Sequence, residues 1–206
     1  MSESTTSEQF WESRYAGASP LSSGKPGTVL VRFAEHLKPG RALELGCARG
    51  DDAVWLATRG WNVVAVDVSH QVLGYAADNA RRHAVAEKIT FEQHDLSQTF
   101  PDGEYNLVTA SFLESPVEFG RSSVLKTAAG RVKSGGLLLI TSHGSAASWS
   151  DHRPSPFPTP DEACADLRLN ADAWQPLFVG NIERLARGPN GETGNILDTV
   201  IALHRL

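Results

Sequence analysis

The segment Leu43-Glu44-Leu45-Gly46-Cys47-Ala48-Arg49-Gly50 decides the fold. The apolar residues 41–45 predict a short strand, and residues 51–58 predict a helix with two acidic residues in its first turn. Small residues between them let a ligand lie close to the backbone where the strand turns into the helix. Asp51 and Asp52 would repel a pyrophosphate at that helix start, so we expect a neutral or cationic ligand.

Outward from this turn, strands and helices alternate along the chain. Strands are expected at residues 41–45, 62–66, 89–93, 105–111 and 137–142, and helices at 51–58, 69–83 and 121–132. This rhythm predicts parallel βαβ units in a doubly wound α/β sheet. Residues 178–187 and 196–204 flank the turn Gly188-Pro189-Asn190-Gly191, which predicts an antiparallel C-terminal hairpin and seven strands in all.

The length of 206 residues predicts a single domain, 1–206. Within it we expect an N-terminal cap helix and loop at 1–27 and a cofactor-binding sheet at 28–142. Residues 143–177 include a long Pro-rich stretch that leaves the sheet at the ligand edge, and we interpret them as an acceptor lid. Residues 178–206 form the closing hairpin.

Composition excludes several classes of protein. The net charge of −5 argues against a general nucleic-acid partner, which needs clustered Lys and Arg. Two cysteines, Cys47 and Cys164, are too few for a disulfide framework or a zinc cluster, so no metal site is expected. No apolar run is long enough for a membrane span and the start lacks a signal peptide, so we expect a cytoplasmic protein with no membrane partner.

Three further signals fall at the same edge of the predicted sheet as the glycine turn. Asp67 ends the second strand, where an acid can bind the ribose hydroxyls of an adenosine cofactor. Asp95 follows the third strand, where it could accept a hydrogen bond from an adenine amino group or serve as a turn residue. Thr109-Ala110-Ser111-Phe112 ends the fourth strand. Ligands of open α/β sheets bind at this carboxyl edge.

Together these motifs resemble the class I S-adenosylmethionine-dependent methyltransferases. The resemblance rests on LELGCARG, then AVD at 65–67, HDL at 94–96 and YNLVTAS at 105–111, and on the closing hairpin. The start FWESRY and the short length look like the small bacterial methyltransferases related to the tellurite-resistance methyltransferase. The resemblance covers about Phe10 to Leu206 and implies a Rossmann-like fold. It also implies methyl transfer from S-adenosylmethionine by in-line displacement, releasing S-adenosylhomocysteine.

Carried over residue by residue, the resemblance implies a set of cofactor-binding residues. Glu44 and the turn at 46–50 would hold the methionine part, Asp67 the ribose, and Ser111 would border the sulfonium. Ala48 departs from the family's middle glycine, and Asn106 stands where an Asp is common, so we expect a shifted contact at Ala48. The implied set is Tyr15, Glu44, Gly46, Cys47, Ala48, Gly50, Asp67, Val68, Asp95, Leu96, Ala110 and Ser111.

The acceptor and any catalytic base are poorly defined by the sequence. His143 after the fifth strand and Glu114 after the fourth are the candidates for a base, and His70 and His152 are further ones. We expect a small-molecule acceptor, with the oligomeric state, monomer or dimer, left open. Two alternatives remain at this point: an NAD-dependent oxidoreductase, and a non-catalytic regulatory protein that binds S-adenosylmethionine.

Overall fold

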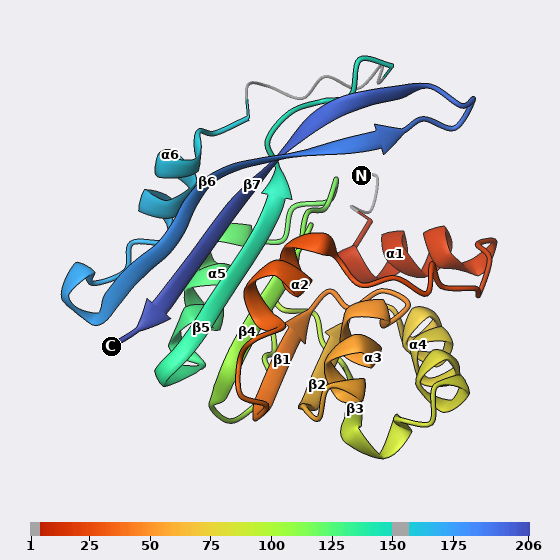
Figure 1. Ribbon diagram of the computed structural model, residues 1–206. Coiled ribbons are helices and arrows are strands. Elements are labelled where there is room, and N and C mark those ends of the chain that lie inside the picture. Colours follow the sequence, from red (N-terminus) through yellow and green to blue (C-terminus); the bar gives the residue numbers. More distant parts are fainter. Residues whose placement is uncertain (1–4, 150–156) are drawn as a thin grey trace.

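The computed structural model describes residues 5–149 and 157–206, which have an α/β fold built on a seven-stranded sheet (Figure 1). The strand order is β3-β2-β1-β4-β5-β7-β6. The first five strands in the chain run parallel to one another, and β7 pairs antiparallel with β5 and β6. The strands are β1 (Arg41–Leu45), β2 (Asn62–Asp67), β3 (Ile89–Gln93), β4 (Tyr105–Ser111), β5 (Val132–His143), β6 (Trp174–Arg187) and β7 (Thr193–Arg205). The predicted fold class is confirmed.

Helices cover both faces of the sheet because its strands carry apolar side chains on both sides. One face packs against α2 (Thr28–Ala34), α3 (Asp51–Thr58) and α4 (His70–Arg82). The other packs against α5 (Arg121–Gly130) and the end of α6 (Pro160–Asp166), where Leu167 is buried. The short 3₁₀ turns η1 (Ala86–Lys88) and η2 (Ala171–Ala173) precede β3 and β6.

The helix starts follow local capping chemistry. The Thr159 hydroxyl accepts from the backbone N–H of Glu162, and the Glu162 carboxylate accepts from the backbone N–H of Thr159, so the two residues form a capping box. Ser69 caps α4 in the same way through the N–H of Val72. Thr6 caps α1 (Ser7–Ala16), the expected N-terminal cap helix, by accepting from the backbone N–H of Gln9.

The hairpin β6–β7 is longer than the sequence predicts and overhangs the site edge. β6 starts at Trp174 instead of 178, because the strand continues through an irregularity between Pro176 and Phe178. β5 ends where His143 pairs with Asp198, whereas β6 and β7 go on pairing as far as Arg187 and Thr193. Figure 1 shows this free end rising beyond the last residues of β4 and β5.

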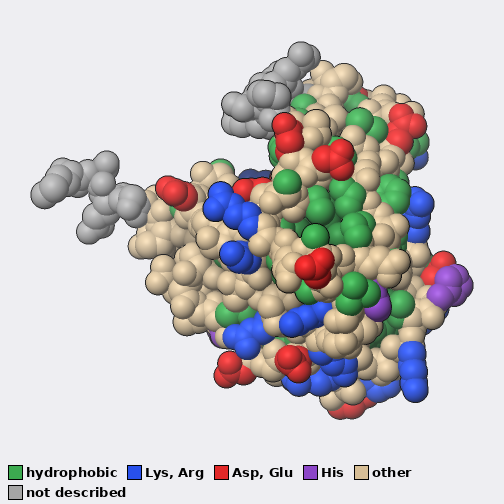
Figure 2. Space-filling model, turned by 90° about the vertical axis from the view of Figure 1, so that its left-hand side faces the viewer, with side chains coloured by type: hydrophobic (Ala, Val, Ile, Leu, Met, Phe, Trp, Pro, Cys, Tyr) green, Lys and Arg blue, Asp and Glu red, His purple; other side chains and the backbone are tan. Residues whose placement is uncertain are grey.

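The other edge of β6 has no partner strand in the described chain. Leu177 and Leu185 are exposed along it, while Pro176 removes one backbone donor. Figure 2 shows this side of the molecule, with hydrophobic side chains gathered in its upper half and most Lys and Arg below them. Among the described residues, no helix is long and apolar enough to cross a membrane.

Candidate functional site

Two adjoining cavities lie at the carboxyl edge of the parallel strands. They have volumes of about 250 and 300 Å³ and share Gly46, Ala48 and Ser111, which are the turn after β1 and the tip of β4. The first cavity is lined by Ser7, Trp11, Tyr15, Gly46, Ala48, Asp67, Val68, His94, Asp95, Leu96, Ser111, Phe112, Leu113, Glu114, Ser115 and Phe119. The second is lined by Leu21, Ser23, Glu44, Gly46, Cys47, Ala48, Arg49, Asp51, Asp52 and Ser111.

The structure brings most of the predicted cofactor residues together around these cavities. Ten of the twelve line one or both of them. Gly50 and Ala110 do not. Gly50 has φ +73 and lies against α4, where an added Cβ would be 3.0 Å from the Cβ of Ala76. Ala110 is buried in the apolar core on the face of the sheet that α5 covers. Gly50 therefore supports the turn by packing against α4, and Ala110 supports β4 by packing in the core.

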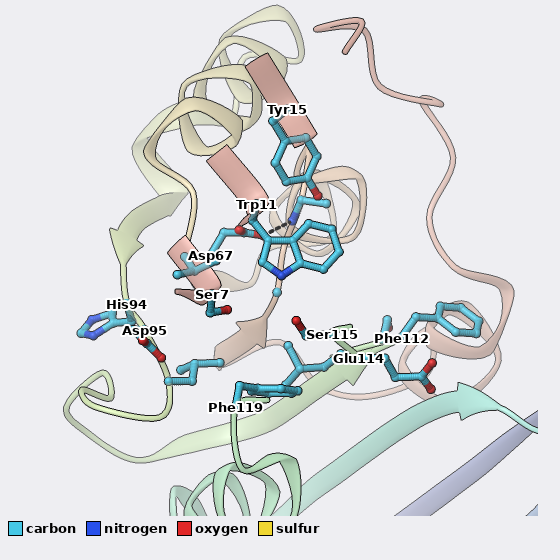
Figure 3. A pocket seen from close by; sticks show the side chains of 16 residues that line it. Ser7, Trp11, Tyr15, Asp67, His94, Asp95, Phe112, Glu114, Ser115 and Phe119 are labelled. Atoms are coloured by element: carbon cyan, nitrogen blue, oxygen red, sulfur yellow. Dashed lines mark hydrogen bonds between the residues drawn. The ribbon is translucent and has the colours of Figure 1, made fainter. Parts of the chain in front are cut away.

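Helix α1 forms a roof over the first cavity. Trp11 and Tyr15 stack with their ring centroids 5.9 Å apart and point down towards the strand ends (Figure 3). The Arg49 guanidinium lies 5.5 Å from the Tyr15 ring centroid. Burial, and secondarily the negative charge of Asp67, raises the pKa of Tyr15 to about 12, so its hydroxyl stays protonated at neutral pH.

Two carboxylates of α1 connect this roof to the rest of the chain: Glu8 accepts from the side-chain amide of Gln93 at 3.0 Å, and Glu12 binds the start of α4. Glu12 accepts hydrogen bonds from the Ser69 hydroxyl at 3.1 Å and from the backbone N–H of His70 at 2.6 Å. These donors lie at the start of α4, where the helix dipole favours a negative charge. Since no residue of α1 is buried, Glu12 supplies much of what holds the helix in place.

Asp67 joins the turns that follow β1 and β2. Its carboxylate accepts from the backbone N–H of Ala48 at 3.0 Å and from that of Ser69 at 3.1 Å. The side chain is 8% exposed and lines the first cavity, beside Val68. Burial raises its pKa, whereas these backbone donors lower it. A carboxylate fixed in this way keeps free lone pairs for hydroxyl groups of a ligand.

The turn after β1 requires unusual backbone angles. Gly46 has φ +70, and an added Cβ there would lie 2.8 Å from Leu113. Ala48 also has a positive φ, 47°, which costs about 1 kcal/mol for a residue with a side chain. The hydrogen bond from Ala48 to Asp67 offsets part of this cost. Strain of this kind is typical of functional turns.

The second cavity is acidic. Asp52 accepts from the backbone N–H of Gly27 at 2.6 Å and from the Ser111 hydroxyl at 3.3 Å. Asp51 binds the 18–27 loop through Ser23. Glu44 is 4% exposed, and its Oε2 has no hydrogen-bond partner among the described residues. Buried polar atoms in proteins are nearly always hydrogen-bonded, so we expect a ligand to donate a hydrogen bond to this oxygen.

The carboxylates raise one another's pKa values. The pKa of Glu44 lies well above its usual value, first because the group is buried and next because Asp52 and Asp67 are close. Burial and the Glu44 charge likewise raise the pKa of the Cys47 thiol, so that thiol is unreactive. A cation bound in this cavity would stabilise the ionised carboxylates. These carboxylates therefore favour the binding of an ammonium or a sulfonium group and disfavour that of a phosphate.

The end of the first cavity beside Val68 holds Asp95 and Leu96 together with His94. Asp95 Oδ1 accepts from the backbone and hydroxyl of Ser97, at 3.0 and 2.6 Å, so it does serve as a turn residue. The ring of His94 is held by Glu92 and Thr99, at 3.0 and 2.9 Å.

The two candidate bases lie next to each other. The backbone N–H of His143 donates to Oε1 of Glu114 at 3.0 Å, and the His143 Nδ1 is 3.9 Å from Oε2. Glu114 lines the first cavity, whereas His143 reaches it only through Phe112, with ring centroids 4.7 Å apart. His70 is exposed on α4 and lines neither cavity, and His152 lies outside the described residues.

Seven residues that line the first cavity are absent from the predicted cofactor-binding set and from the candidate bases: Ser7, Trp11, His94, Phe112, Leu113, Ser115 and Phe119. Figure 3 shows Ser115 and Phe119 across the cavity from Trp11, with Glu114 beside Phe112. The last four of these seven residues belong to the loop between β4 and α5, which has no periodic pattern. One signal was available, since Phe112 directly follows a strand tip. The described part of residues 143–177 lines neither cavity, and α6 lies on the face of the sheet that α5 covers.

The chain has relatives among methyltransferases. Residues 42–136 match the methyltransferase domain family. The chain is 31% identical over 112 residues to probable thiol methyltransferase 2 of Arabidopsis thaliana, covering 52% of this chain and 48% of the relative. It is 29% identical over 109 residues to the ribosomal protein L11 methyltransferase of Burkholderia cenocepacia, covering 52% and 33%. The chain thus spans about half or less of the length of these relatives.

Solved structures share the fold at low identity. A structure from work on converting a disulfide bond into a thioacetal group during echinomycin biosynthesis has a TM-score of 0.70, with 21% identity over 97% of this chain and 92% of that one. TehB from Haemophilus influenzae scores 0.67, with 16% identity over 97% and 67%. The glycopeptide N-methyltransferase MtfA complexed with S-adenosylhomocysteine scores 0.61, with 17% identity over 98% and 99%. Residues 42–136 therefore match a methyltransferase domain, and the described chain shares the fold of these solved structures.

Proposed function

We propose that this protein transfers a methyl group from S-adenosylmethionine to a small-molecule acceptor and releases S-adenosylhomocysteine. The observation that carries the proposal is the acidic second cavity, where Glu44 Oε2 is buried without a partner among the described residues. This cavity adjoins one lined by Asp67 and two aromatic rings. A ligand with a cationic amino acid end and a neutral nucleoside end matches this pair of environments.

Each part of the site has a proposed role in holding that ligand. Glu44 would accept from the amino group, and Asp67 would bind the ribose hydroxyls. Tyr15 would cover the ligand from α1. The proposed cofactor-binding set is Tyr15, Glu44, Gly46, Cys47, Ala48, Asp67, Val68, Asp95, Leu96 and Ser111, with Gly50 and Ala110 supporting it.

When bound, S-adenosylmethionine supplies a methyl group on a good leaving group, the sulfonium. The proposed chemistry is an in-line displacement, so the main work of the chain is to position the reactants. Ser111, held by Asp52, and Phe112 border the cavity where the strand β4 ends. His143 and Glu114 are the groups from which a base would come if the acceptor carries a proton that must be removed.

The volume of the first cavity, about 250 Å³, fits a small acceptor, and the net charge of −5 favours such an acceptor over a nucleic acid. The free cysteines fit a reducing, cytoplasmic location. We also propose that the chain divides into a cap helix and loop (1–27), a cofactor-binding sheet (28–142), an acceptor lid (143–177) and a closing hairpin (178–206).

The test is calorimetry followed by turnover. S-adenosylmethionine and S-adenosylhomocysteine should bind and NAD should not, and the reverse result would refute the proposal in favour of an oxidoreductase. Release of S-adenosylhomocysteine should then be measured with thiol, phenol, amine and metalloid acceptors, and with ribosomal particles. Turnover of a small molecule supports the proposal. Turnover with ribosomal particles alone would contradict the acceptor class, and binding without any turnover would favour a regulatory role.

A further inference from the structure

The overhanging hairpin places a cation beside the cavity, at a point that the cofactor proposal does not use. Arg184 lies on β6, and its guanidinium carbon is 5.5 Å from the ring centroid of Phe112. Phe112 lines the first cavity and is 37% exposed. These two residues are 72 positions apart in the chain, and only the length of β6 beyond the end of β5 brings them together.

Arg184 is held in position by a buried partner. Its Nε donates to Oδ2 of Asp198 at 2.6 Å, and the Asp198 side chain is 3% exposed. The Arg184 side chain is 36% exposed. Because Asp198 uses only Nε, the two terminal NH₂ groups are left without a hydrogen bond to any other described residue. These groups form the fork that binds an anionic group with two hydrogen bonds.

Phe112 is itself held in an unusual conformation. Its φ is +52, in the left-handed region that bulky residues rarely adopt. The backbone N–H donates to the carbonyl of Thr141 at 2.8 Å, and the ring meets His143 edge to face. The strained turn presents an apolar ring at the rim of the cavity, between His143 and Arg184.

Two other charged groups near Phe112, Glu114 and Arg121, have partners elsewhere in the chain. Glu114 accepts from the backbone N–H of His143 and lies beside its ring. Arg121 donates to the Leu113 carbonyl and to the Ser142 hydroxyl, so it is already satisfied within the chain. Arg184 is therefore the cation available to a ligand that lies on Phe112.

From this arrangement we propose that Arg184 and Phe112 form the acceptor subsite, and that the acceptor is a small apolar molecule carrying an anionic group. The apolar body lies on Phe112 with its reactive atom in the first cavity, and the anionic group binds the Arg184 fork. Asp198 is a positioning residue that keeps this fork turned towards Phe112. The inference rests on the proposed methyltransferase function and deepens it.

The test uses pairs of acceptors that differ in charge alone. One pair is 4-mercaptobenzoate and 4-mercaptobenzamide, and the other is 4-hydroxybenzoate and 4-hydroxybenzamide. With the wild-type protein, kcat/KM for a carboxylate should exceed that for its amide. Arg184→Gln should lower kcat/KM for the carboxylate by about 10- to 100-fold, mainly through KM, and leave the amide within about threefold. Arg184→Lys, which keeps the charge and loses the fork, should fall between them.

Two controls keep the result interpretable. Arg184→Gln leaves the Asp198 carboxylate buried and unpaired, which can unfold the domain, so the double variant with Asp198→Asn is made as well. Arg187→Gln removes an exposed cation from the opposite face of the same strand and should leave both members of each pair unchanged. Calorimetry with S-adenosylhomocysteine should give the wild-type affinity for all these variants.

The outcomes separate this inference from the function on which it rests. Failure of the wild-type protein to bind S-adenosylmethionine refutes the function and with it the subsite. If the cofactor binds, three results overturn the subsite alone: equal use of carboxylate and amide, an Arg184→Gln variant that loses both equally, or no turnover of either carboxylate.

Discussion

The backbone N–H of Ala48 donates a 3.0 Å hydrogen bond to the carboxylate of Asp67, and so ties the turn after β1 to the turn after β2. Ala48 has a positive φ, which places its N–H in the direction of the neighbouring strand tip. The carboxylate that is proposed to bind the ribose is therefore also part of the framework of the site. Substitution at Asp67 should affect both binding and stability.

Asp67→Asn should weaken S-adenosylmethionine binding severely, by about 100-fold or more, since a charged acceptor is replaced by an amide. Stability should fall by roughly 1–3 kcal/mol, because one backbone donor loses a good acceptor. Calorimetry and urea denaturation measure the two effects. Asp78→Asn, on the exposed side of α4, is the matched control and should change neither. Unchanged affinity in folded Asp67→Asn would show that the ribose lies elsewhere.

Glu44→Gln should stabilise the cofactor-free protein while weakening cofactor binding. The pKa of Glu44 is raised in the folded state, so the folded protein holds a proton that the unfolded chain releases above about pH 4.5. Wild-type stability is therefore lost as pH rises from 4.5 towards the folded pKa, and the neutral amide avoids that loss. We expect the variant to be more stable at pH 7.5 by roughly 1–3 kcal/mol, with little gain at pH 4.

Thermal or urea unfolding at both pH values checks this, with calorimetry for the cofactor. Glu104→Gln, an exposed site, is the control. A stability gain that does not depend on pH would contradict the explanation by burial of the charge.

Cofactor binding should release protons at neutral pH. A cationic group placed beside Glu44 lowers the raised pKa of that carboxyl, so a proton that it holds in the free protein leaves on binding. Affinity should therefore fall as pH decreases. Calorimetry in two buffers with different ionisation enthalpies measures the number of protons released. Glu44→Gln should release fewer, and an equal heat of binding in both buffers for the wild-type protein would contradict the prediction.

Glu12→Ala should loosen the roof of the cavity. Without this carboxylate the start of α4 loses its acceptor, and α1, which has no buried residue, keeps only the Glu8–Gln93 bond as a side-chain hydrogen bond to the rest of the described chain. We expect faster hydrogen exchange in residues 7–16 and faster cofactor dissociation, by about 10-fold, with the core of the sheet unaffected. Hydrogen-exchange mass spectrometry and stopped-flow measurement of dissociation test this. Glu104→Ala is the control, and unaltered exchange in α1 would show that other contacts hold it.

The parts of the fold that depend on local pattern could be predicted from the sequence. The ranges of α3, β3 and β4 agree with the expected residues, and the Thr159–Glu162 capping box is present. Each of these follows from neighbouring residues, either through hydrophobic periodicity or through a cap. The antiparallel hairpin was expected because its turn residues are specific.

Features that depend on contacts between distant residues could not be predicted. Helix α1 has no amphipathic pattern, so nothing local shows that Trp11 roofs a cavity. The overhang of β6 beyond β5 brings Arg184 to Phe112, and its start at Trp174 depends on pairing past Pro176 with β7. Gly50 has a backbone angle that suits a ligand-binding turn, but the structure uses it for packing against Ala76. The sequence pattern alone cannot separate those two uses of a glycine.

The order of the strands also has a consequence for how the chain is made. β7 lies between β5 and β6 but follows both of them in the sequence, so neither can complete its pairing until β7 has left the ribosome. During synthesis β5 is an open edge with four parallel strands behind it, and β6 has no partner at all. Exposed apolar edges of this kind recruit other chains. We therefore expect yield in the cell to depend on how quickly residues 193–205 follow residues 174–187, and slow translation of that short stretch should increase aggregation without any change in the amino-acid sequence.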